Sequence, residues 1–159
     1  MKIAVVSDTH RIHSKIMKVC ESIKALNPDM ILHLGDVTDD ADLMEALLDR
    51  EVRRVPGNCD VADREPGTLF IKAEGLLILA THGHHHRVKT TLHDLARDAK
   101  KHGAKVALFG HTHVALEDEV DGVMVLNPGS ASLPKNDQKS GYAMMTVTGE
   151  DISVKFIHI

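Results

Sequence analysis

Seven polar residues of three types stand where short apolar runs of the sequence end. The runs are typical of buried β-strands, and each candidate comes with a glycine or another turn-forming residue nearby. In α/β sheets, ligands bind at the carboxyl edge of the strands, so side chains far apart in sequence converge there. We therefore expect one shared site built from Asp8, His10, Asp36, Asn58, His82, His111 and His113.

The donor set combines carboxylate oxygens, imidazole nitrogens and one amide oxygen. This mixture suits Mn, Zn or Fe better than Ca or Mg alone, and the lack of a thiolate cage excludes a structural zinc finger. Seven ligands exceed the needs of one tetrahedral ion, but they suffice for two ions that share a bridging carboxylate. Two ions about 3.5–4 Å apart clamp an in-line displacement at phosphorus, and a water between them becomes the nucleophile. The residues thus favour a dinuclear phosphoesterase that acts through a metal-bridged hydroxide.

The order and spacing of these residues resemble the motif set of the calcineurin-like metallophosphoesterases. The matching motifs are Asp8-x-His10, Gly35-Asp36, Gly57-Asn58, His82 and Gly110-His111-x-His113. The resemblance extends from Met1 to about Ser132. The short chain and its Asn127-Pro128-Gly129-Ser130 segment are similar to the small prokaryotic phosphodiesterase branch. The resemblance implies an α/β fold, a four-layer α/β/β/α sandwich of two mixed sheets flanked by helices.

The resemblance also divides the ligands into two groups of three with one carboxylate between them. These are Asp8, His10 and His113 for the first ion, Asn58, His82 and His111 for the second, and Asp36 as the bridge. Family members are commonly active with manganese, and others use zinc, iron or nickel. We therefore expect two divalent metal ions as cofactors of a phosphodiesterase in which Asp36 and Asn58 are also catalytic.

One position departs from the commoner family pattern. Many members carry a histidine directly after the motif asparagine, where it is thought to protonate the leaving group or steady the phosphate, but here this residue is Cys59. A neutral thiol, with a reference pKa of about 8.5, can donate a proton but suits neutral pH less well. His84 is therefore a candidate catalytic residue, and Arg11 is a candidate phosphate contact beside Cys59. The alternative for His84 and Arg11 is a solvated loop side chain.

The elements that position these residues begin in a β-α-β-α-β order. The expected elements are strands over 2–7, 30–34, 52–56, 68–73, 76–80, 105–109, 115–120, 123–126, 142–148 and 152–157, with helices over 12–26, from Asp39 or Asp40 as N-cap, and from 91 to 103. The early order predicts a parallel sheet with crossover helices, and the number of later strands predicts a second sheet. His33 lies inside the second strand, where we expect a hydrogen-bonded structural residue or one that orients a ligand.

Composition limits the class of protein. The 159 residues are expected to form a single domain over 1–159, and two cysteines do not make a disulfide framework. The N-terminal apolar run, Ile3 to Val6, is too short for a signal peptide or a membrane span. We expect a cytoplasmic protein with a small phosphodiester substrate and no membrane partner. The net charge of −4 argues against a stable nucleic-acid partner. Exposed strands late in the sequence could pair with those of a second copy, so a homo-oligomer stays an alternative.

Two other functions stay open as alternatives. A nuclease or a cyclic-nucleotide phosphodiesterase would use the same ions, although no basic stripe supports the nuclease. A non-catalytic metal-binding scaffold is the second alternative, because a eukaryotic retromer subunit resembles this small fold and binds proteins. Since a fold does not fix a function, the completeness of the ligand set is the feature that favours an enzyme.

Overall fold

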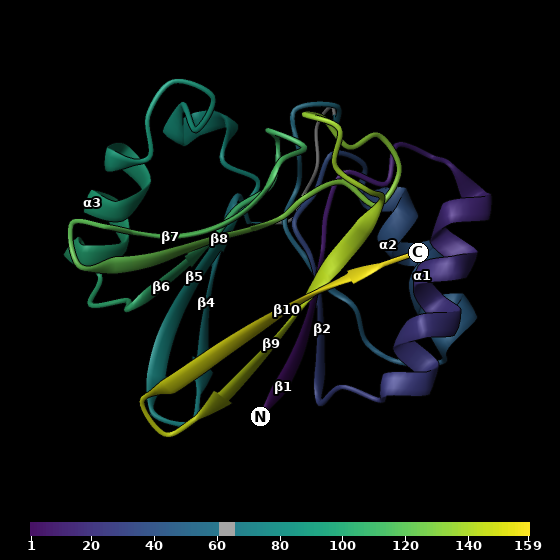
Figure 1. Ribbon diagram of the computed structural model, residues 1–159, viewed down its shortest axis with the longest axis horizontal. Coiled ribbons are helices and arrows are strands. Elements are labelled where there is room, and N and C mark those ends of the chain that lie inside the picture. Colours follow the sequence, from purple (N-terminus) through teal and green to yellow (C-terminus); the bar gives the residue numbers. More distant parts are fainter. Residues whose placement is uncertain (61–65) are drawn as a thin grey trace.

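Two five-stranded sheets pack face to face and carry helices on their outer faces (Figure 1). The computed structural model describes residues 1–60 and 66–159. One sheet has the order β10-β9-β1-β2-β3 and the other has the order β4-β5-β6-β8-β7. The elements are β1 (Lys2–Val6), α1 (His13–Leu26), β2 (Met30–His33), α2 (Thr38–Leu48), β3 (Arg53–Arg54), β4 (Thr68–Ala73), β5 (Leu76–Thr81), η1 (His84–His86), α3 (His93–Lys101), β6 (Val106–Leu108), β7 (Ala115–Val120), β8 (Val123–Pro128), β9 (Gly141–Thr148) and β10 (Asp151–His158). The predicted α/β/β/α sandwich is confirmed.

Strand β1 shows how the sequence creates four layers. Because successive side chains of a strand point to opposite faces, Ile3 and Val5 enter the core between the sheets, whereas Ala4 and Val6 pack beneath the helices. Both faces of this central strand are buried, which explains its continuous apolar run. Helices α1 and α2 cover this sheet, and α3 covers the other sheet through a separate apolar cluster (Figure 1).

The expected boundaries differ from the observed ones chiefly at α2 and β3. Helix α2 begins at Thr38 after Val37 as N-cap, with no side-chain cap, so neither Asp39 nor Asp40 caps it. The Asp40 side chain is instead buried and accepts hydrogen bonds from the loop after β1. The third strand is shorter than predicted, because only Arg53–Arg54 pairs with β2.

Parallel pairing determines where the strand ends meet. Strand β1 pairs in parallel with β2, β2 with β3, and β5 with β6. The carboxyl ends of these strands therefore lie at the same end of each sheet, and the packing of the sheets brings the two edges together. Within residues 1–60 and 66–159, no helix is long and apolar enough to cross a lipid bilayer.

Candidate metal centre

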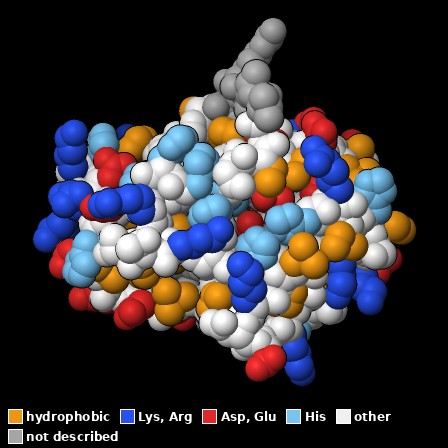
Figure 2. Space-filling model, turned by 90° about the horizontal axis from the view of Figure 1, so that it is seen from above, with side chains coloured by type: hydrophobic (Ala, Val, Ile, Leu, Met, Phe, Trp, Pro, Cys, Tyr) orange, Lys and Arg blue, Asp and Glu red, His pale blue; other side chains and the backbone are white. Residues whose placement is uncertain are grey.

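The predicted ligands gather at the carboxyl ends of the parallel strands. Asp8 and His10 follow β1, Asp36 follows β2, Asn58 follows β3, His82 follows β5, and His111 and His113 follow β6. Histidine side chains are conspicuous on this face of the molecule (Figure 2). Ligand atoms lie within 4.8 Å of one another in two groups, which are Asp8-His10-His113 and Asp8-Asp36-His82.

The first group is held together by short contacts across the chain. His10 Nε2 lies 3.0 Å from His113 Nε2, and His113 Nε2 lies 3.3 Å from Asp8 Oδ1. The other nitrogen of the same ring, His10 Nδ1, lies 2.7 Å from Asp36 Oδ2. Asp36 therefore contacts the first group while it belongs to the second.

The second group extends to an amide and a further imidazole. His82 Nε2 lies 3.0 Å from Asn58 Oδ1, and the ring centroids of His82 and His111 are 5.0 Å apart. Asp8 is a member of both groups of converging atoms, so two carboxylates, Asp8 and Asp36, lie between them. The donors therefore form two overlapping groups that share Asp8, and each group could hold a metal ion.

Backbone carbonyls fix the ring tautomers of two histidines. His82 Nδ1 lies 2.7 Å from Leu34 O, and His113 Nδ1 lies 2.8 Å from Leu133 O. Since a carbonyl oxygen only accepts hydrogen bonds, each Nδ1 carries the proton, and in the neutral ring Nε2 presents a lone pair to the site. His82 Nε2 then faces the Asn58 amide oxygen, which is another acceptor. Two acceptors in contact fit a bound cation between them.

The buried carboxylates carry the same signature. Asp8 Oδ2 accepts hydrogen bonds from Ser7 Oγ and the His111 amide, but Asp8 Oδ1 and Asp36 Oδ2 have no hydrogen-bond donor. Burial alone would raise the pKa of Asp8. The His113 and His82 rings and the Ser7 hydroxyl together lower that pKa by more than burial raises it, so the net shift is downward. These two oxygens contact only imidazole nitrogens, and a buried carboxylate is costly unless it is paired or coordinates a metal. The donor set thus fits divalent cations.

Backbone strain is concentrated at the same residues. Five of the seven predicted ligands have positive φ, at 54° for Asp8, 50° for His10, 92° for Asp36, 66° for His111 and 62° for His113. Such a conformation is uncommon for residues other than glycine and persists where surrounding contacts enforce it, often at functional sites. The loops after β1, β2 and β6 are therefore shaped to present these side chains.

A buried polar chain that the sequence did not reveal supports two of these loops. The Gly35 amide donates to His33 Nδ1 at 3.2 Å, so His33 Nε2 carries the proton and donates to Thr9 Oγ1 at 3.0 Å. Thr9 Oγ1 donates to Asp40 Oδ2 at 2.5 Å, and the Arg11 amide donates to the same oxygen at 2.8 Å. The chain ties the loop after β1 to the loop after β2, which confirms His33 as a structural residue.

The buried His33 ring in this hydrogen-bonded chain makes the stability of the metal-free protein pH-dependent. Burial lowers the pKa of His33 to about 4, whereas an unfolded histidine titrates at about 6.5. Between these values the unfolded chain binds a proton that the folded chain does not, so acidification favours unfolding. Above about pH 6.5 the titration of His33 should not change the free energy of unfolding. As the pH falls from there to about 4, this titration should lower the free energy of unfolding by about 3 kcal/mol.

Urea unfolding of the metal-free protein over this pH range measures the effect. His33→Gln should reduce the slope of unfolding free energy against pH, because it removes one of the titrating groups. His158→Gln, at an exposed position, is the matched control and should keep the wild-type slope. An unchanged slope in His33→Gln would contradict this account of the buried ring.

The segment at the end of β8 is hydrogen-bonded to the ligand-bearing loops after β1 and β6. Ser130 Oγ donates to Asp8 O at 2.6 Å, and Ser132 Oγ donates to Thr9 O at 2.7 Å. Asn127 Nδ2 donates to Gly110 O at 2.8 Å, just before His111. These residues lie in or beside the segment 127–130, whose sequence resembles the small prokaryotic branch of the family. Their role became visible only through contacts between distant parts of the chain.

The remaining predicted site residues border the centre. The His84 ring lies 5.4 Å from the His82 ring and 6.1 Å from the His111 ring, and mainly burial lowers the pKa of His84 to about 4. Cys59 is exposed, and a hydrogen bond to Asp36 is the main reason that the pKa of its thiol is raised. At neutral pH the His84 ring is therefore neutral, and Cys59 keeps its proton.

Comparison with known proteins identifies the family. The model of the calcineurin-like phosphoesterase superfamily domain matches residues 1–150. The chain belongs to this superfamily. A probable metallophosphoesterase of Bacillus subtilis (strain 168) is 31% identical over 156 residues, which cover 98% of this chain and 90% of the relative. The phosphodiesterase MJ0936 of Methanocaldococcus jannaschii is 31% identical over 149 residues, which cover 81% of this chain and 83% of that protein.

Solved structures of other proteins share the fold. A predicted phosphoesterase from Streptococcus pneumoniae TIGR4 superposes with a TM-score of 0.83 at 28% identity, covering 99% of this chain and 88% of that one. A Vps29 variant from Entamoeba histolytica superposes with a TM-score of 0.80 at 22% identity, covering 100% of this chain and 99% of that one. The superfamily is one of metal-dependent phosphoesterases, and this chain has two groups of converging donors that could hold a metal ion.

Proposed function

We propose that the chain is a phosphodiesterase whose centre binds two divalent cations, with manganese the first candidate and zinc, iron and nickel the others. The observation that carries the proposal is the convergence of lone pairs from fixed histidine tautomers and donor-less carboxylate oxygens. The resemblance assigns Asp8, His10 and His113 to one cation and Asn58, His82 and His111 to the other, with Asp36 between them. The contacts support that division and add Asp8 as a second shared carboxylate.

The bound cations would supply charge stabilisation at the phosphoryl oxygens and lower the pKa of water at the site. The chain's own side chains bind and orient the substrate around them. Arg11, exposed beside His10, offers a guanidinium to a phosphate oxygen. His84 is neutral at pH 7, so it serves as a hydrogen-bond donor to the phosphate rather than as a ready proton source.

The proton for the leaving group is then assigned to Cys59. Its raised pKa keeps the thiol protonated at neutral pH, and the side-chain amide of neighbouring Asn58 donates to its Sγ at 3.6 Å, which supports this role. A thiol is a weak acid, so esters with good leaving groups should react fastest. The likeness to the phosphodiesterase of Methanocaldococcus jannaschii supports a small diester over a monoester as substrate.

Hydrolysis of two p-nitrophenyl compounds tests this function. We expect the chelator-treated protein to be inactive, and manganese to restore hydrolysis of bis-p-nitrophenyl phosphate. The value of kcat/KM for this diester should exceed that for p-nitrophenyl phosphate by about tenfold or more. Turnover that does not depend on metal, or a preference for the monoester, would contradict the proposal.

A protein-binding scaffold is the second candidate. The shared fold with Vps29 structures motivates it, although at this identity the likeness concerns the fold alone. The filled ligand set favours the enzyme, since a scaffold does not need every ligand. Binding of two metal ions by a protein that hydrolyses neither p-nitrophenyl compound would favour the scaffold instead.

A further inference from the structure

Helix α2 begins just after the predicted ligand Asp36 and has no local cap. Its N-cap residue, Val37, makes no side-chain hydrogen bond, although the first amides of a helix have no acceptor within the helix. The Asp60 carboxylate supplies an acceptor from 22 positions away. The Thr38 amide donates to Asp60 Oδ1 at 2.9 Å, and the Thr38 hydroxyl donates to the same oxygen at 3.2 Å. The start of α2 is therefore held by a residue of the loop after β3.

The same carboxylate closes the turn that carries Asn58. Asp60 Oδ2 accepts a hydrogen bond from the Gly57 amide at 2.8 Å, and the Asp60 amide donates to Gly57 O at 3.3 Å. Asn58 lies inside this turn, and its Oδ1 atom lies 3.0 Å from His82 Nε2. Asp60 thus uses one oxygen for the first turn of α2 and the other for the loop after β3.

Asp40 connects the first turn of α2 to the loop after β1. Its side chain is buried, and its Oδ2 atom accepts hydrogen bonds from the Thr9 hydroxyl at 2.5 Å and from the Arg11 amide at 2.8 Å. Thr9 is buried and stands between the predicted ligands Asp8 and His10. The two donors come from either side of His10, so the contact fixes the backbone of this ligand.

We propose that Asp40 and Asp60 are positioning residues of the metal centre, through which the first turn of α2 holds the ligand loops after β1, β2 and β3 in register. The inference rests on the proposed function, because it concerns the cations of that centre. A carboxylate suits this task, since both of its oxygens only accept hydrogen bonds and can serve two segments at once. Contacts that orient metal ligands in this way are worth about 10–100-fold in metal affinity.

The two aspartates should act on different cations. Asp40 holds the loop of Asp8 and His10, which the resemblance assigns to the first cation. Asp60 holds the turn of Asn58, which the resemblance assigns to the second cation. A general loss of stability would weaken the binding of both cations alike. We therefore expect each contact to affect mainly one of two manganese-binding steps.

Substitution of Thr9 tests the Asp40 contact. Thr9→Val removes the hydroxyl and keeps a branched side chain, whereas Thr9→Ser keeps the hydroxyl. When manganese is titrated into the chelator-treated protein in a calorimeter, Thr9→Val should weaken one binding step by about tenfold or more, and Thr9→Ser should restore it. Ser22→Ala is the control, because it removes a hydroxyl that lies 2.8 Å from the hydroxyl of buried Tyr142. It should lower the free energy of unfolding and leave both steps unchanged.

Asp60→Asn tests the other contact and does not depend on the folding of Thr9→Val. An amide group in place of one oxygen cannot accept a hydrogen bond, so the variant must release either Thr38 or Gly57. The other manganese step should weaken by about tenfold or more.

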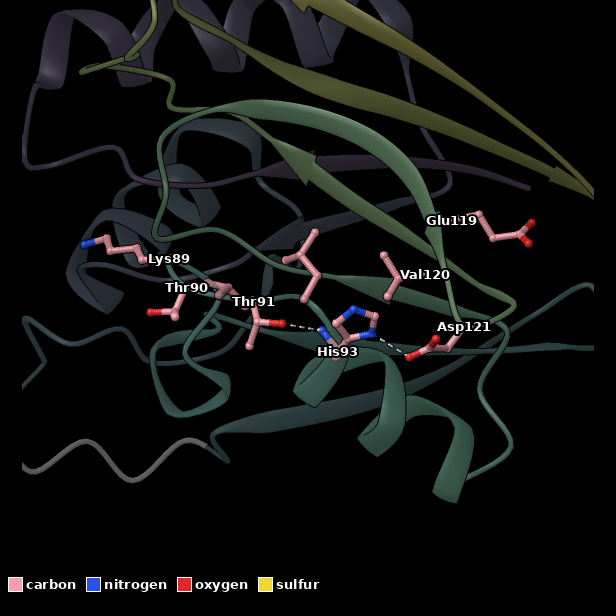
Figure 3. Close-up of a pocket in the computed structure, with 9 residues that line it drawn as sticks. Lys89, Thr90, Thr91, His93, Glu119, Val120 and Asp121 are labelled. Atoms are coloured by element: carbon pink, nitrogen blue, oxygen red, sulfur yellow. Dashed lines mark hydrogen bonds and ion pairs between the residues drawn. The ribbon is translucent and has the colours of Figure 1, made fainter.

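Asp121→Asn makes the same chemical change away from the centre. Asp121 also joins two segments, since it pairs with His93 at 2.8 Å beside an open pocket of about 450 Å³ (Figure 3). It precedes β8, which runs parallel to β6, so it lies at the opposite end of the sheet from the ligands. Both manganese affinities should stay at the wild-type values in this variant.

Manganese binding and hydrolysis of bis-p-nitrophenyl phosphate separate this inference from the proposed function. If the wild type binds manganese without hydrolysing the diester, and the two variants each weaken one step, the phosphodiesterase fails and the positioning role stands. If the wild type hydrolyses the diester and both variants keep the wild-type affinities, the positioning role fails and the phosphodiesterase stands. Equal weakening of both steps in each variant would make Asp40 and Asp60 structural residues only and would overturn the inference.

Discussion

Asp36→Asn should abolish the metal-dependent hydrolysis of bis-p-nitrophenyl phosphate, lowering kcat/KM on the order of 10³-fold, or about 4 kcal/mol. Asp36 Oδ2 is buried, lacks a hydrogen-bond donor and lies 2.7 Å from His10 Nδ1, so its charge sits between the two groups of donors. The amide has the same shape but no charge, and two neighbouring cations need a shared carboxylate. Metal content after dialysis should fall together with activity.

The same variant should fold normally. Removing one of two neighbouring buried carboxylates relieves repulsion in the metal-free state, so its free energy of unfolding should be no lower than that of the wild type. Asp39→Asn makes the same chemical change at an exposed position of α2 and should leave metal content and activity unchanged. Retention of two metal ions and full activity in Asp36→Asn would refute the proposed bridge.

Gly57→Ala should damage stability and metal binding together. A Cβ at residue 57 would lie 2.2 Å from the Asp36 amide nitrogen and 2.3 Å from the Asp36 Cα, which no real contact allows. The backbone of Asp36 must therefore move, and such overpacking costs about 1–3 kcal/mol of unfolding free energy. Because a displacement of the ligand loop also separates Asp36 from His10, the affinity for manganese should fall by about tenfold or more.

Gly67→Ala is the matched control for this prediction. Among residues 1–60 and 66–159, no heavy atom lies within 4 Å of the Cβ that it would add, so its unfolding midpoint in urea and its manganese titration should match the wild type. Equal losses in the two variants would contradict the steric explanation, because an alanine that fits without strain stabilises the fold through the lower entropy of the unfolded chain. A stable Gly57→Ala protein that binds manganese normally would contradict the prediction, because the loop after β2 would then have moved without loss of stability.

The sequence by itself determined most of the strands and the identity of the converging residues, and its resemblance to a known family implied the sandwich. Apolar runs are long enough to predict buried strands, and parallel pairing sends their carboxyl ends to one edge. The chemistry of the donors then follows from side-chain type alone. The shorter β3 and the start of α2 escaped prediction, because the local signal at Asp39 and Asp40 matches a cap while the fold assigns Asp40 another partner.

Only the tertiary structure decided how the centre is assembled. His10 meets His113 across 103 positions of sequence, and Ser132 meets Thr9 across 123. Ring tautomers, donor-less carboxylate oxygens and the Asp40–Thr9–His33 chain all depend on such distant partners, which spacing along the chain does not encode.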